Sequence, residues 1–477
     1  MKQLNVFFYC LLGMIATEPA RATPKPNIVV ILMDDVGYGD IGPFGSKVNR
    51  TPNLDRMAAE GMKLTSFYSA PVCSAARAQL MTGCYSKRVS IDGVLFPVSS
   101  TGLNPEETTI AEVLKQQEYA TMMVGKWHLG DQAEFLPTRQ GFEHFFGIPY
   151  SNDMDGPSEP GSGSREATRP PLPLLRDETV IEAPPVQHSL TERFTEESLG
   201  FIRAHREKPF FLYLAHIATH VPLEPGKAFL GKSANGSYGD WIQETDWSVG
   251  RILDTLRELK LDDRTLVIFT SDNGPWLSKR SKAGVATPLR GGKFSCWEGG
   301  IRVPAIAWMP GRVPAGSVSD AVASTMDLLP TAATLAGGKP PSDHVIDGVD
   351  LWPLLSGKST DSPHEALAYW EGQALAALRL KDWKLLIRPQ KEMEQAKLET
   401  GPDPGDFKPR LYDLGNDPGE TTDIADQHPD IVQRLQEHIH RIAADLGLKG
   451  GKAPGIRPAG RVTKPVPLVD HADHDGG

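Results

Sequence analysis

Cysteine is scarce in this 477-residue chain, which contains four. So few cysteines exclude a small disulfide-rich scaffold, while 40% hydrophobic and 23% charged residues are typical of a globular protein. Positively charged residues are also fewer than negatively charged ones, with 50 Lys and Arg against 60 Asp and Glu. The resulting formal net charge of −10 argues against nucleic acid or an anionic membrane as the partner. The sequence has no internal repeat and, beyond its first residues, no apolar run long enough to span a membrane.

The first residues have the pattern of a secretory signal peptide. Lys2 is followed by an apolar run from Leu4 to Ala16, which is too short for a membrane span, and then by Ala20-Arg21-Ala22. We therefore predict that residues 1–22 are a cleaved signal and that the mature protein is secreted or periplasmic.

Three cysteines remain after this segment: Cys73, Cys84 and Cys296. In an exported protein an odd number of cysteines marks one thiol as chemically distinct. A disulfide between Cys84 and Cys296 is one arrangement that leaves Cys73 free, and other arrangements stay open at this point.

Short apolar runs alternate with amphipathic stretches along most of the chain. Continuous rather than alternating hydrophobicity is typical of strands that helices cover on both faces. The expected strands are Ile28–Met33, Ala120–Val124, Phe210–Ala215, Leu266–Thr270 and Val303–Trp308. The expected helices are Asn53–Gly61, Thr108–Gln117, Leu190–His205 and Gly239–Leu259. This alternation predicts an α/β fold with a large mixed, mainly parallel sheet sandwiched by helices.

The length and a change of pattern near residue 365 predict two domains. Residues 23–365 form the large domain, residues 366–450 a smaller C-terminal α+β subdomain, and residues 451–477 a loose tail rich in Gly and Pro. Residues 151–190 show little periodicity and predict a long surface insertion. The expected elements of the subdomain are the strands Ala366–Trp370, Ala374–Leu380, Trp383–Arg388 and Arg410–Asp413 and the helix Pro429–Leu446.

Polar residues follow four of the expected strands at the point where each strand ends. Ligands of open α/β sheets bind beyond the carboxyl ends of the strands, so these side chains are expected to form one composite site. The residues are Asp34, Asp35, Lys126, His128, His216, His220, Asp272 and Asn273. A single loop histidine is more often a hydrogen-bonding group than a catalytic one, and we assign that structural role to His216.

The acidic members of this set and the asparagine supply only oxygen ligands. Hard cations such as calcium and magnesium take ligand sets of this kind, here Asp34, Asp35, Asp272 and Asn273, whereas zinc usually takes His or Cys as well. Each acidic pair alone is more often a turn or a helix cap. Repetition of an acid after successive strands favours a site for a divalent cation.

Cys73 and Arg77 lie four residues apart on an expected helix, so both side chains point to one face. A nucleophile at the amino terminus of a helix lies in positive potential. Lys293 follows two glycines that let it approach a bound anion closely, and His220 is a candidate general acid. Taken alone, the Cys-x-x-x-Arg spacing is also compatible with a buried structural cysteine.

The segment around these residues resembles the sulfatase signature C-x-P-S-R-x-x-x-x-x-G. Cys73, Arg77 and Gly83 match it, while Ala75 and Ala76 stand where proline and serine are usual. Further matching segments are Asn27–Asp35, Thr51–Asp55, Gly125–Gly130, Thr270–Gly274, Trp297–Pro304 and Leu411–Leu414. The chain is thus similar to the formylglycine-dependent sulfatases of the alkaline phosphatase superfamily from Pro26 to about Ala425. Residues 218–220, 229–231, 238–240 and 341–348 resemble the N-acetylgalactosamine-6-sulfatase and arylsulfatase A branch.

The resemblance implies two additions to the chain. A maturation enzyme would oxidise Cys73 to formylglycine, whose hydrated aldehyde is the nucleophile in that family. One calcium ion would bind residue 73 together with the oxygen ligands named above, namely Asp34, Asp35, Asp272 and Asn273. The alanines at 75 and 76 bear on the maturation step more than on catalysis, because a methyl group offers no chemistry.

The resemblance also implies a role for each remaining polar residue. Arg77 and Lys126 would steady the formylglycine, Lys293 would bind the sulfate, and His220 would protonate the leaving alcohol. The hydrate attacks sulfur in line and a covalent sulfate ester remains. His128 then helps to remove the proton of the second hydroxyl, so that the aldehyde re-forms and sulfate is expelled. The implied substrate is a sulfated sugar or a fragment of a sulfated polysaccharide.

Two other functions are compatible with these residues. A phosphonate or phosphate monoester hydrolase of the same superfamily can use the same nucleophile and metal site. A glycan-binding protein without activity would keep Cys73 unconverted. Relative turnover of an aryl sulfate and an aryl phosphate distinguishes the first, and the mass of the peptide that contains Cys73 distinguishes the second.

Overall fold

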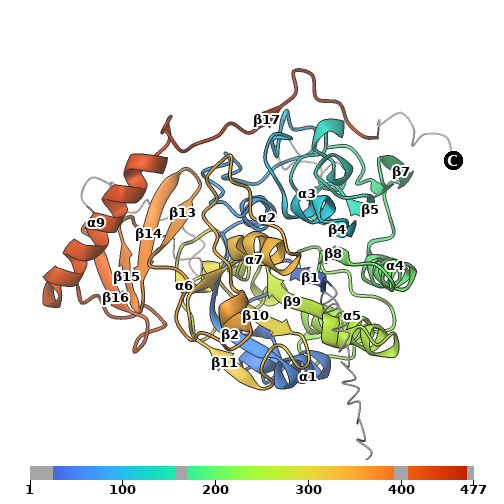
Figure 1. Ribbon diagram of the computed structural model, residues 1–477, viewed down its shortest axis with the longest axis horizontal. Helices are drawn as coiled ribbons and strands as arrows, with labels where there is room; N and C mark the ends of the chain where they lie inside the picture. The colour runs from blue at the N-terminus through green and yellow to red at the C-terminus, as the bar shows by residue number, and fades with distance from the viewer. Residues whose placement is uncertain (1–24, 157–168, 391–406, 470–477) are drawn as a thin grey trace, which may run out of the picture.

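A computed structural model describes residues 25–156, 169–390 and 407–469 (Figure 1). The expected signal segment 1–22 lies outside the described residues. The large domain is built on an 11-stranded sheet in the order β11-β2-β10-β9-β1-β8-β4-β5-β6-β7, with β12 paired to β2. Its strands are β1 Asn27–Met33, β2 Met62–Tyr68, β4 Ala120–Lys126, β5 His144–Ile148, β6 Leu174–Arg176, β7 Thr179–Glu182, β8 Phe210–Ala215, β9 Thr265–Ser271, β10 Arg302–Trp308, β11 Ser317–Ser319 and β12 Ala323–Ser324.

The centre of this sheet is parallel. β9, β1, β8, β4 and β5 are neighbours and all run in one direction, whereas β10 is antiparallel to both β9 and β2. The prediction of a large mixed, mainly parallel sheet is therefore confirmed. All five expected strands are present, and the sheet also contains β2, β5, β6, β7, β11 and β12.

Helices cover both faces of the sheet, as the continuous apolar runs predict. Alternate residues of β1 point to opposite faces: Val30 packs in one apolar cluster and Val29 in the other. The helices of the large domain are α1 Pro52–Glu60, α2 Cys73–Thr82, α3 Ile110–Gln116, α4 Leu190–Ala204, α5 Gly236–Glu258, α6 Glu298–Ile301, α7 Leu328–Leu335 and α8 Trp352–Leu355. Side chains of α2, α3 and α7 pack on the first face, and those of α1, α4 and α5 on the second.

The region expected to be a surface insertion is partly sheet. Within residues 151–190, β6 pairs antiparallel with β5, and β7 pairs antiparallel with β6, so both extend one edge of the main sheet. These strands are short, and their flanks are rich in Gly and Pro, which explains why periodicity does not reveal them. Residues 157–168 lie outside the described part of the chain.

The C-terminal subdomain has the expected α+β composition. Its antiparallel sheet consists of β13 Leu367–Glu371, β14 Ala374–Leu380, β15 Trp383–Leu386 and β16 Arg410–Asp413, and helix α9 Pro429–Leu446 packs beside it (Figure 1). Trp297 and Tyr68 of the large domain belong to the same apolar cluster as this sheet, so the two domains share a core.

The segment after α9 differs from the expected loose tail. It runs back along the large domain, where β17 Gly460–Arg461 pairs with β3 Thr101–Gly102 (Figure 1). Arg457 also forms an ion pair with Glu107 at 2.7 Å. Composition did not predict this packing, because the contacts join residues more than 300 positions apart along the chain.

The proposed Cys84–Cys296 disulfide does not form. Cys73, Cys84 and Cys296 are all buried free thiols in the structure. Cys84 lies beside Arg457, and Cys296 precedes α6 in the core that the two domains share. Among the residues described, none of the helices has the length and apolar character needed to cross a membrane.

Candidate active site

Four neighbouring parallel strands deliver the polar residues to one edge of the sheet. The order β9-β1-β8-β4 places the carboxyl ends of these strands side by side. Backbone hydrogen bonds continue beyond the strands: Asp34 N donates to Ala218 O at 2.8 Å, and Asp272 N donates to Met33 O at 3.0 Å. The structure therefore brings together the residues that the sequence placed after separate strands.

The backbone turns sharply at two of these positions. Asp35 and His128 both adopt left-handed conformations, with φ of 61° and 63°, which are uncommon for residues other than glycine. Gly125 on β4 has φ of 107°, and a Cβ there would lie 1.9 Å from Ala215 O of β8. Backbone strain of this kind is typical of functional sites, where the surrounding structure holds it in place.

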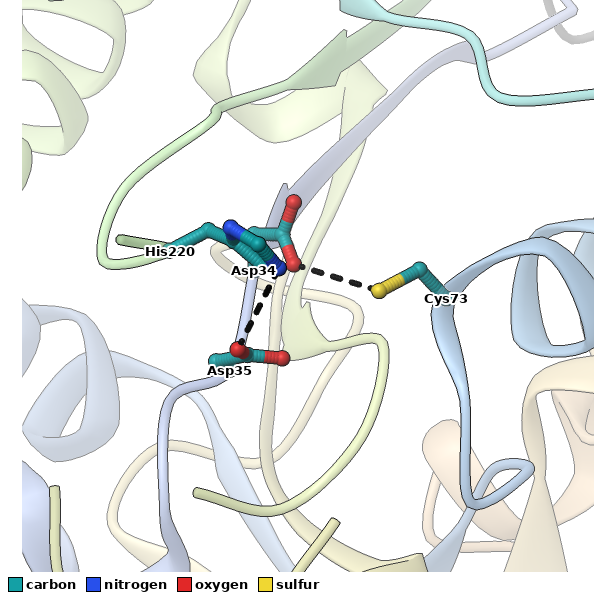
Figure 2. A group of neighbouring side chains, drawn as sticks. All are labelled: Asp34, Asp35, Cys73 and His220. Carbon is teal, nitrogen blue, oxygen red and sulfur yellow. Dashed lines mark hydrogen bonds and ion pairs between the residues drawn. The ribbon is translucent and has the colours of Figure 1, made fainter. Parts of the chain in front are cut away.

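Helix α2 begins at Cys73, which puts this side chain at the helix amino terminus. Sγ of Cys73 lies 3.6 Å from Oδ1 of Asp34 (Figure 2) and 3.1 Å from Nζ of Lys293. Burial raises the pKa of the Cys73 thiol well above its usual range, so the unmodified side chain is neutral at neutral pH. Ala75 and Ala76 are also buried and pack in a small apolar cluster, where small side chains fit.

Arg77 is fully buried and joins three elements of the site. Its guanidinium donates to Oδ2 of Asp272 at 2.9 Å and to the carbonyl oxygen of Lys126 at 2.5 Å. A further contact to Oδ2 of Asp34 is 3.4 Å long. Because Cys73 and Arg77 share a face of α2, the hydrogen bonds of the planar Arg77 guanidinium hold the start of the helix against the strand ends.

Three buried carboxylates face three buried cations. Nζ of Lys126 lies 2.5 Å from Oδ2 of Asp34, and Nζ of Lys293 lies 2.6 Å from Oδ1 of Asp35. Burial would raise the pKa of Asp34, yet Lys126 and its positive neighbours hold it below its usual range. Burial and the charge of Asp34 raise the pKa of Asp272 to about 6. Although burial opposes its charge, Asp35 holds the pKa of Lys293 well above its usual range.

The oxygen-rich side of the cluster fits a hard divalent cation. Ligand atoms of Asp34, Asp35, Cys73 and His220 lie within 4.8 Å of one another, and Figure 2 shows these four side chains converging. Asn273 donates through Nδ2 to Oδ1 of Asp35 at 2.7 Å, while its buried Oδ1 has no hydrogen-bond partner in the described part of the chain. Several carboxylate oxygens and an open amide oxygen are the donors that calcium and magnesium take.

The two histidines are held by backbone carbonyl oxygens. Nε2 of His128 lies 2.9 Å from Leu95 O, and Nδ1 of His220 lies 2.8 Å from Val221 O. Because a carbonyl oxygen only accepts, each contact fixes the proton on that nitrogen and leaves the other nitrogen free. Burial, and then the charge of Lys126, lowers the pKa of His128. Burial also lowers the pKa of His220, whose Nε2 lies 3.7 Å from Oδ2 of Asp35.

His216 lies apart from this convergence. Its Nε2 contacts Ser248 Oγ of α5 at 3.1 Å, and burial lowers its pKa to about 3, so the ring is neutral. His216 therefore has the hydrogen-bonding role expected for it, but it is buried and not the surface group that a loop histidine usually is.

Sequence reasoning missed four residues at the site. Ser151 accepts a hydrogen bond from Nζ of Lys126 at 3.1 Å, and Oδ1 of Asp153 lies 3.9 Å from Nδ1 of His220. The ring of Trp276 is 5.4 Å from that of His220, and Leu95 acts through its backbone carbonyl. Only Trp276 carried a signal, because it follows Asp272 and Asn273 by a few residues on the same loop.

Family models and known proteins match the chain over most of its length. The model described as "Sulfatase" matches residues 26–338, and that described as "C-terminal region of aryl-sulfatase" matches residues 362–450. N-acetylgalactosamine-6-sulfatase of Canis lupus familiaris is 39% identical over 499 residues, covering 94% of this chain and 93% of that protein. Arylsulfatase A of Homo sapiens is 39% identical over 459 residues, covering 90% and 89%.

A solved structure gives the same result. The crystal structure of the PsFucS1 sulfatase from Pseudoalteromonas sp. superposes with a TM-score of 0.79 at 28% identity, covering 88% of this chain and 90% of that one. The similarity thus extends over both domains and includes the strand ends that carry the clustered residues. The chain belongs to the sulfatase family, in the branch of N-acetylgalactosamine-6-sulfatase and arylsulfatase A, and is a sulfuric ester hydrolase.

Proposed function

We propose that this protein hydrolyses sulfate esters of a sulfated sugar or polysaccharide fragment, using formylglycine made from Cys73 and one calcium ion. The observation that supports this most strongly is the place of Cys73: it begins α2 and points to Asp34 and Lys293. A neutral buried thiol is a poor nucleophile, so the chemistry calls for a modified side chain at this position.

Residues of two strand ends and the first residue of α2 would hold the calcium ion. Asp34 and Asp35 after β1, and Asp272 and Asn273 after β9, would supply oxygen ligands together with residue 73. When bound, a hard cation neutralises charge on a sulfate oxygen and on the nucleophile. The unpartnered Oδ1 of Asn273 is the feature of the structure that fits this role best.

Lysine and arginine side chains would position the nucleophile and the sulfate. Lys293 reaches the side chain at residue 73 and approaches from the loop side, so it would bind a sulfate oxygen. Arg77 and Lys126 contact Oδ2 of Asp34, whose Oδ1 faces Cys73, and would steady residue 73 and the carboxylates. All three cations are buried, so their charges act on the sulfate with little screening.

The two histidines would move the protons. His128 carries its proton on Nε2, which leaves the lone pair of Nδ1 as the base for a hydroxyl proton of residue 73. His220 would act as the imidazolium: Nδ1 keeps its proton on Val221 O, and Nε2, which lies 3.7 Å from Oδ2 of Asp35, gives the second proton to the leaving alcohol. Formylglycine, once formed by a maturation enzyme, supplies the hydroxyl that attacks sulfur and the second hydroxyl from which the aldehyde re-forms.

The likeness to N-acetylgalactosamine-6-sulfatase supports a sulfated sugar as the substrate. The apolar run after Lys2 supports export, and thus a secreted or periplasmic protein. An acidic protein can still bind a sulfate ester, because the three buried cations of the site oppose the overall charge of −10 locally.

The test combines a mass measurement with turnover. Trypsin cleavage after Lys63 and Arg77 releases peptide 64–77. Conversion of Cys73 replaces sulfur by oxygen and removes two hydrogens, which lowers the mass of this peptide by a fixed amount. We expect the converted protein to hydrolyse 4-nitrophenyl sulfate faster than 4-nitrophenyl phosphate or a matched phosphonate. Faster turnover of the phosphate or phosphonate would contradict the proposal.

Two variants complete the test. Cys73→Ala is expected to abolish turnover and to leave the fold and the calcium content nearly unchanged, whereas Cys84→Ala, at a thiol outside the site, retains turnover. Residual activity of Cys73→Ala would refute the assignment of the nucleophile. A free thiol at Cys73 in protein from its native host, with no turnover, would instead support a glycan-binding protein.

A further inference from the structure

A short cationic segment lies directly beside the candidate active site. Leu277–Lys282 follows Asp272 and Asn273 on the same loop and contains Lys279, Arg280 and Lys282, all exposed. We call these three side chains the cationic rim. They concentrate positive charge at one place on a chain whose net charge is −10.

The cationic rim is contiguous with the site. Lys282 lines a small hollow together with Asp35, Val221 and Trp276. Nζ of Lys279 lies 4.1 Å from the centre of the Trp276 ring. The hollow itself is too small for a ligand, but its lining places Lys282 beside Asp35 and Trp276 at the edge of the site.

Trp276 shows on which side of the site the rim lies. Its ring centre is 5.4 Å from that of His220, the proposed acid, and 4.9 Å from Nζ of Lys293, the proposed sulfate ligand. Because His220 protonates the departing oxygen, whatever is attached to that oxygen leaves the site on the side of His220. A sugar bound there lies next to Trp276 and within reach of Lys279 and Lys282.

Some exposed arginines elsewhere on the surface are paired with carboxylates. Arg139 contacts Glu178 at 2.8 Å, and Arg176 contacts Glu197 at 2.6 Å. In contrast, none of the three cations of the rim has a carboxylate partner within the described ranges 25–156, 169–390 and 407–469. The rim is therefore available to a negative group of a ligand.

We propose that Lys279 and Lys282 bind a second anionic group of the substrate, a sulfate or carboxylate carried by the sugar whose sulfate ester is hydrolysed or by its neighbour. This inference rests on the proposed sulfatase function of the same site. It narrows the substrate class to saccharides with at least two anionic groups, and it assigns discrimination among them to the 277–282 segment.

Binding measured without turnover tests this proposal. The protein is the calcium-loaded Cys73→Ala variant, and the ligands are N-acetylgalactosamine 6-sulfate and N-acetylgalactosamine 4,6-disulfate. With two exposed charge pairs, we expect roughly tenfold tighter binding of the disulfate. Added Lys279→Gln and Lys282→Gln changes should remove most of this preference while leaving the monosulfate affinity within about twofold. The preference should also decrease as salt increases.

The matched control carries Lys358→Gln and Lys408→Gln, which remove the same charge from exposed positions outside the segment. This control should keep the preference. Arg280 is left unchanged because its φ of 54° makes a substitution there a backbone change as well. The proposal would be overturned if the preference for the disulfate were the same before and after the Lys279 and Lys282 changes. It would also be overturned if these changes weakened the binding of both saccharides equally, or if neither saccharide bound.

The two proposals fail in different measurements. Turnover of 4-nitrophenyl sulfate, which has no second anion, tests the sulfatase chemistry and should change less than about twofold when Lys279 and Lys282 are replaced. Loss of the disulfate preference with unchanged aryl sulfate turnover supports the role of the rim. Absence of aryl sulfate turnover in the converted protein would count against the function and not against the rim.

Discussion

The carbonyl oxygen of Leu95 lies 2.9 Å from Nε2 of His128 and thereby sets the tautomer of this histidine. The amide of Leu95 in turn donates to Oγ of Ser74, the residue after Cys73. One residue of a loop thus connects the proposed base to the first turn of α2. The position of His128 depends on how firmly this loop is held.

The segment after α9 holds both ends of the loop. The backbone of Arg457 exchanges hydrogen bonds with Arg88 and Ser90, at 2.6 Å each. Further along, β17 pairs with β3, so residues 88–90 and 101–102 are both tied to the same C-terminal segment. This segment begins beyond residue 450, where the match to the second family model ends.

Arg457→Ala is expected to loosen this loop. The change leaves the carboxylate of Glu107 buried without its ion pair, which costs roughly 3 kcal/mol of stability. We expect a lower thermal midpoint and a several-fold lower kcat on 4-nitrophenyl sulfate with little change in KM, because His128 is displaced more than the sulfate ligands. Arg461→Ala, at an exposed position on β17, is the control. Equal kcat in the two variants would show that the segment does not position His128.

The sequence predicted which residues cluster wherever a strand end carries the residue. Asp34, Lys126 and Asp272 follow or end buried strands, and parallel neighbours bring such ends together without any long-range information. Leu95 gave no signal, because it acts through a backbone carbonyl that every residue has. Ser151 lies in a segment without periodicity, and only the pairing of β5 with β4 brings its neighbourhood to Lys126.

The contacts between the segment after α9 and the large domain could not be predicted either. Arg457 and Glu107 are paired across 350 positions of the chain, and charged residues of this kind are normally solvated. The fold class was predictable because it depends on local hydrophobic periodicity, whereas the tail depends on specific side-chain pairs that appear only after the sheet and the subdomain have formed.

His220→Ala is expected to separate substrates by their leaving groups. Nitrophenolate leaves without a proton, whereas the alcohol of a sugar needs one, so a general acid matters mainly for the sugar. We expect kcat/KM to fall about 100-fold or more for N-acetylgalactosamine 6-sulfate and less than about tenfold for 4-nitrophenyl sulfate. His144→Ala, at an exposed histidine on β5, is the control. Equal losses on both substrates would assign His220 to binding rather than to proton transfer.

Removal of calcium is expected to abolish turnover with a limited loss of stability. Two acidic residues in sequence suggest strong repulsion in the metal-free protein, but Lys126 and Lys293 lie within 2.6 Å of the Asp34 and Asp35 carboxylates. We expect a chelator to lower the thermal midpoint by a few degrees, as loss of a bound ligand does. Added calcium should restore both activity and midpoint.

Lys126→Met gives the matched comparison for this effect. It removes one of the balancing cations and keeps the length of the side chain, so the Asp34 carboxylate loses its 2.5 Å partner. The drop in midpoint on chelation should then be larger than in the unaltered protein. An equal drop would mean that Lys126 does not offset the charge of the metal-free site.

Lys384→Ala is expected to destabilise the junction of the two domains. Nζ of Lys384 on β15 lies 2.9 Å from Glu298 and 2.8 Å from Glu420, and all three side chains are buried. Removal of the lysine leaves the buried Glu420 without its cation, whereas Glu298 keeps Arg302 at 3.4 Å. The loss costs roughly 3–5 kcal/mol. Because Glu298 begins α6, shortly after Lys293, we expect the KM for sulfate esters to rise as well. Lys408→Ala, at an exposed lysine before β16, should change neither quantity.

Glu244→Gln is expected to change how stability depends on pH. Glu244 on α5 is buried and accepts a hydrogen bond from Gly226 N at 2.7 Å, and burial raises its pKa to about 7. The folded state therefore holds this proton more tightly than the unfolded state. Its contribution to stability is fully present below pH 4.5 and is lost as the pH rises to about 7.

Glutamine keeps the acceptor and has no proton to lose, so the variant escapes this loss. Denaturant unfolding at several pH values measures the difference in the free energy of unfolding between Glu244→Gln and the unaltered protein. This difference should shift in favour of the variant by roughly 3 kcal/mol as the pH rises from 4.5 to about 7. Glu258→Gln removes the same charge from an exposed position at the end of α5 and provides the control. A constant difference between Glu244→Gln and the unaltered protein across this range would mean that the carboxyl of Glu244 titrates alike in the folded and unfolded states.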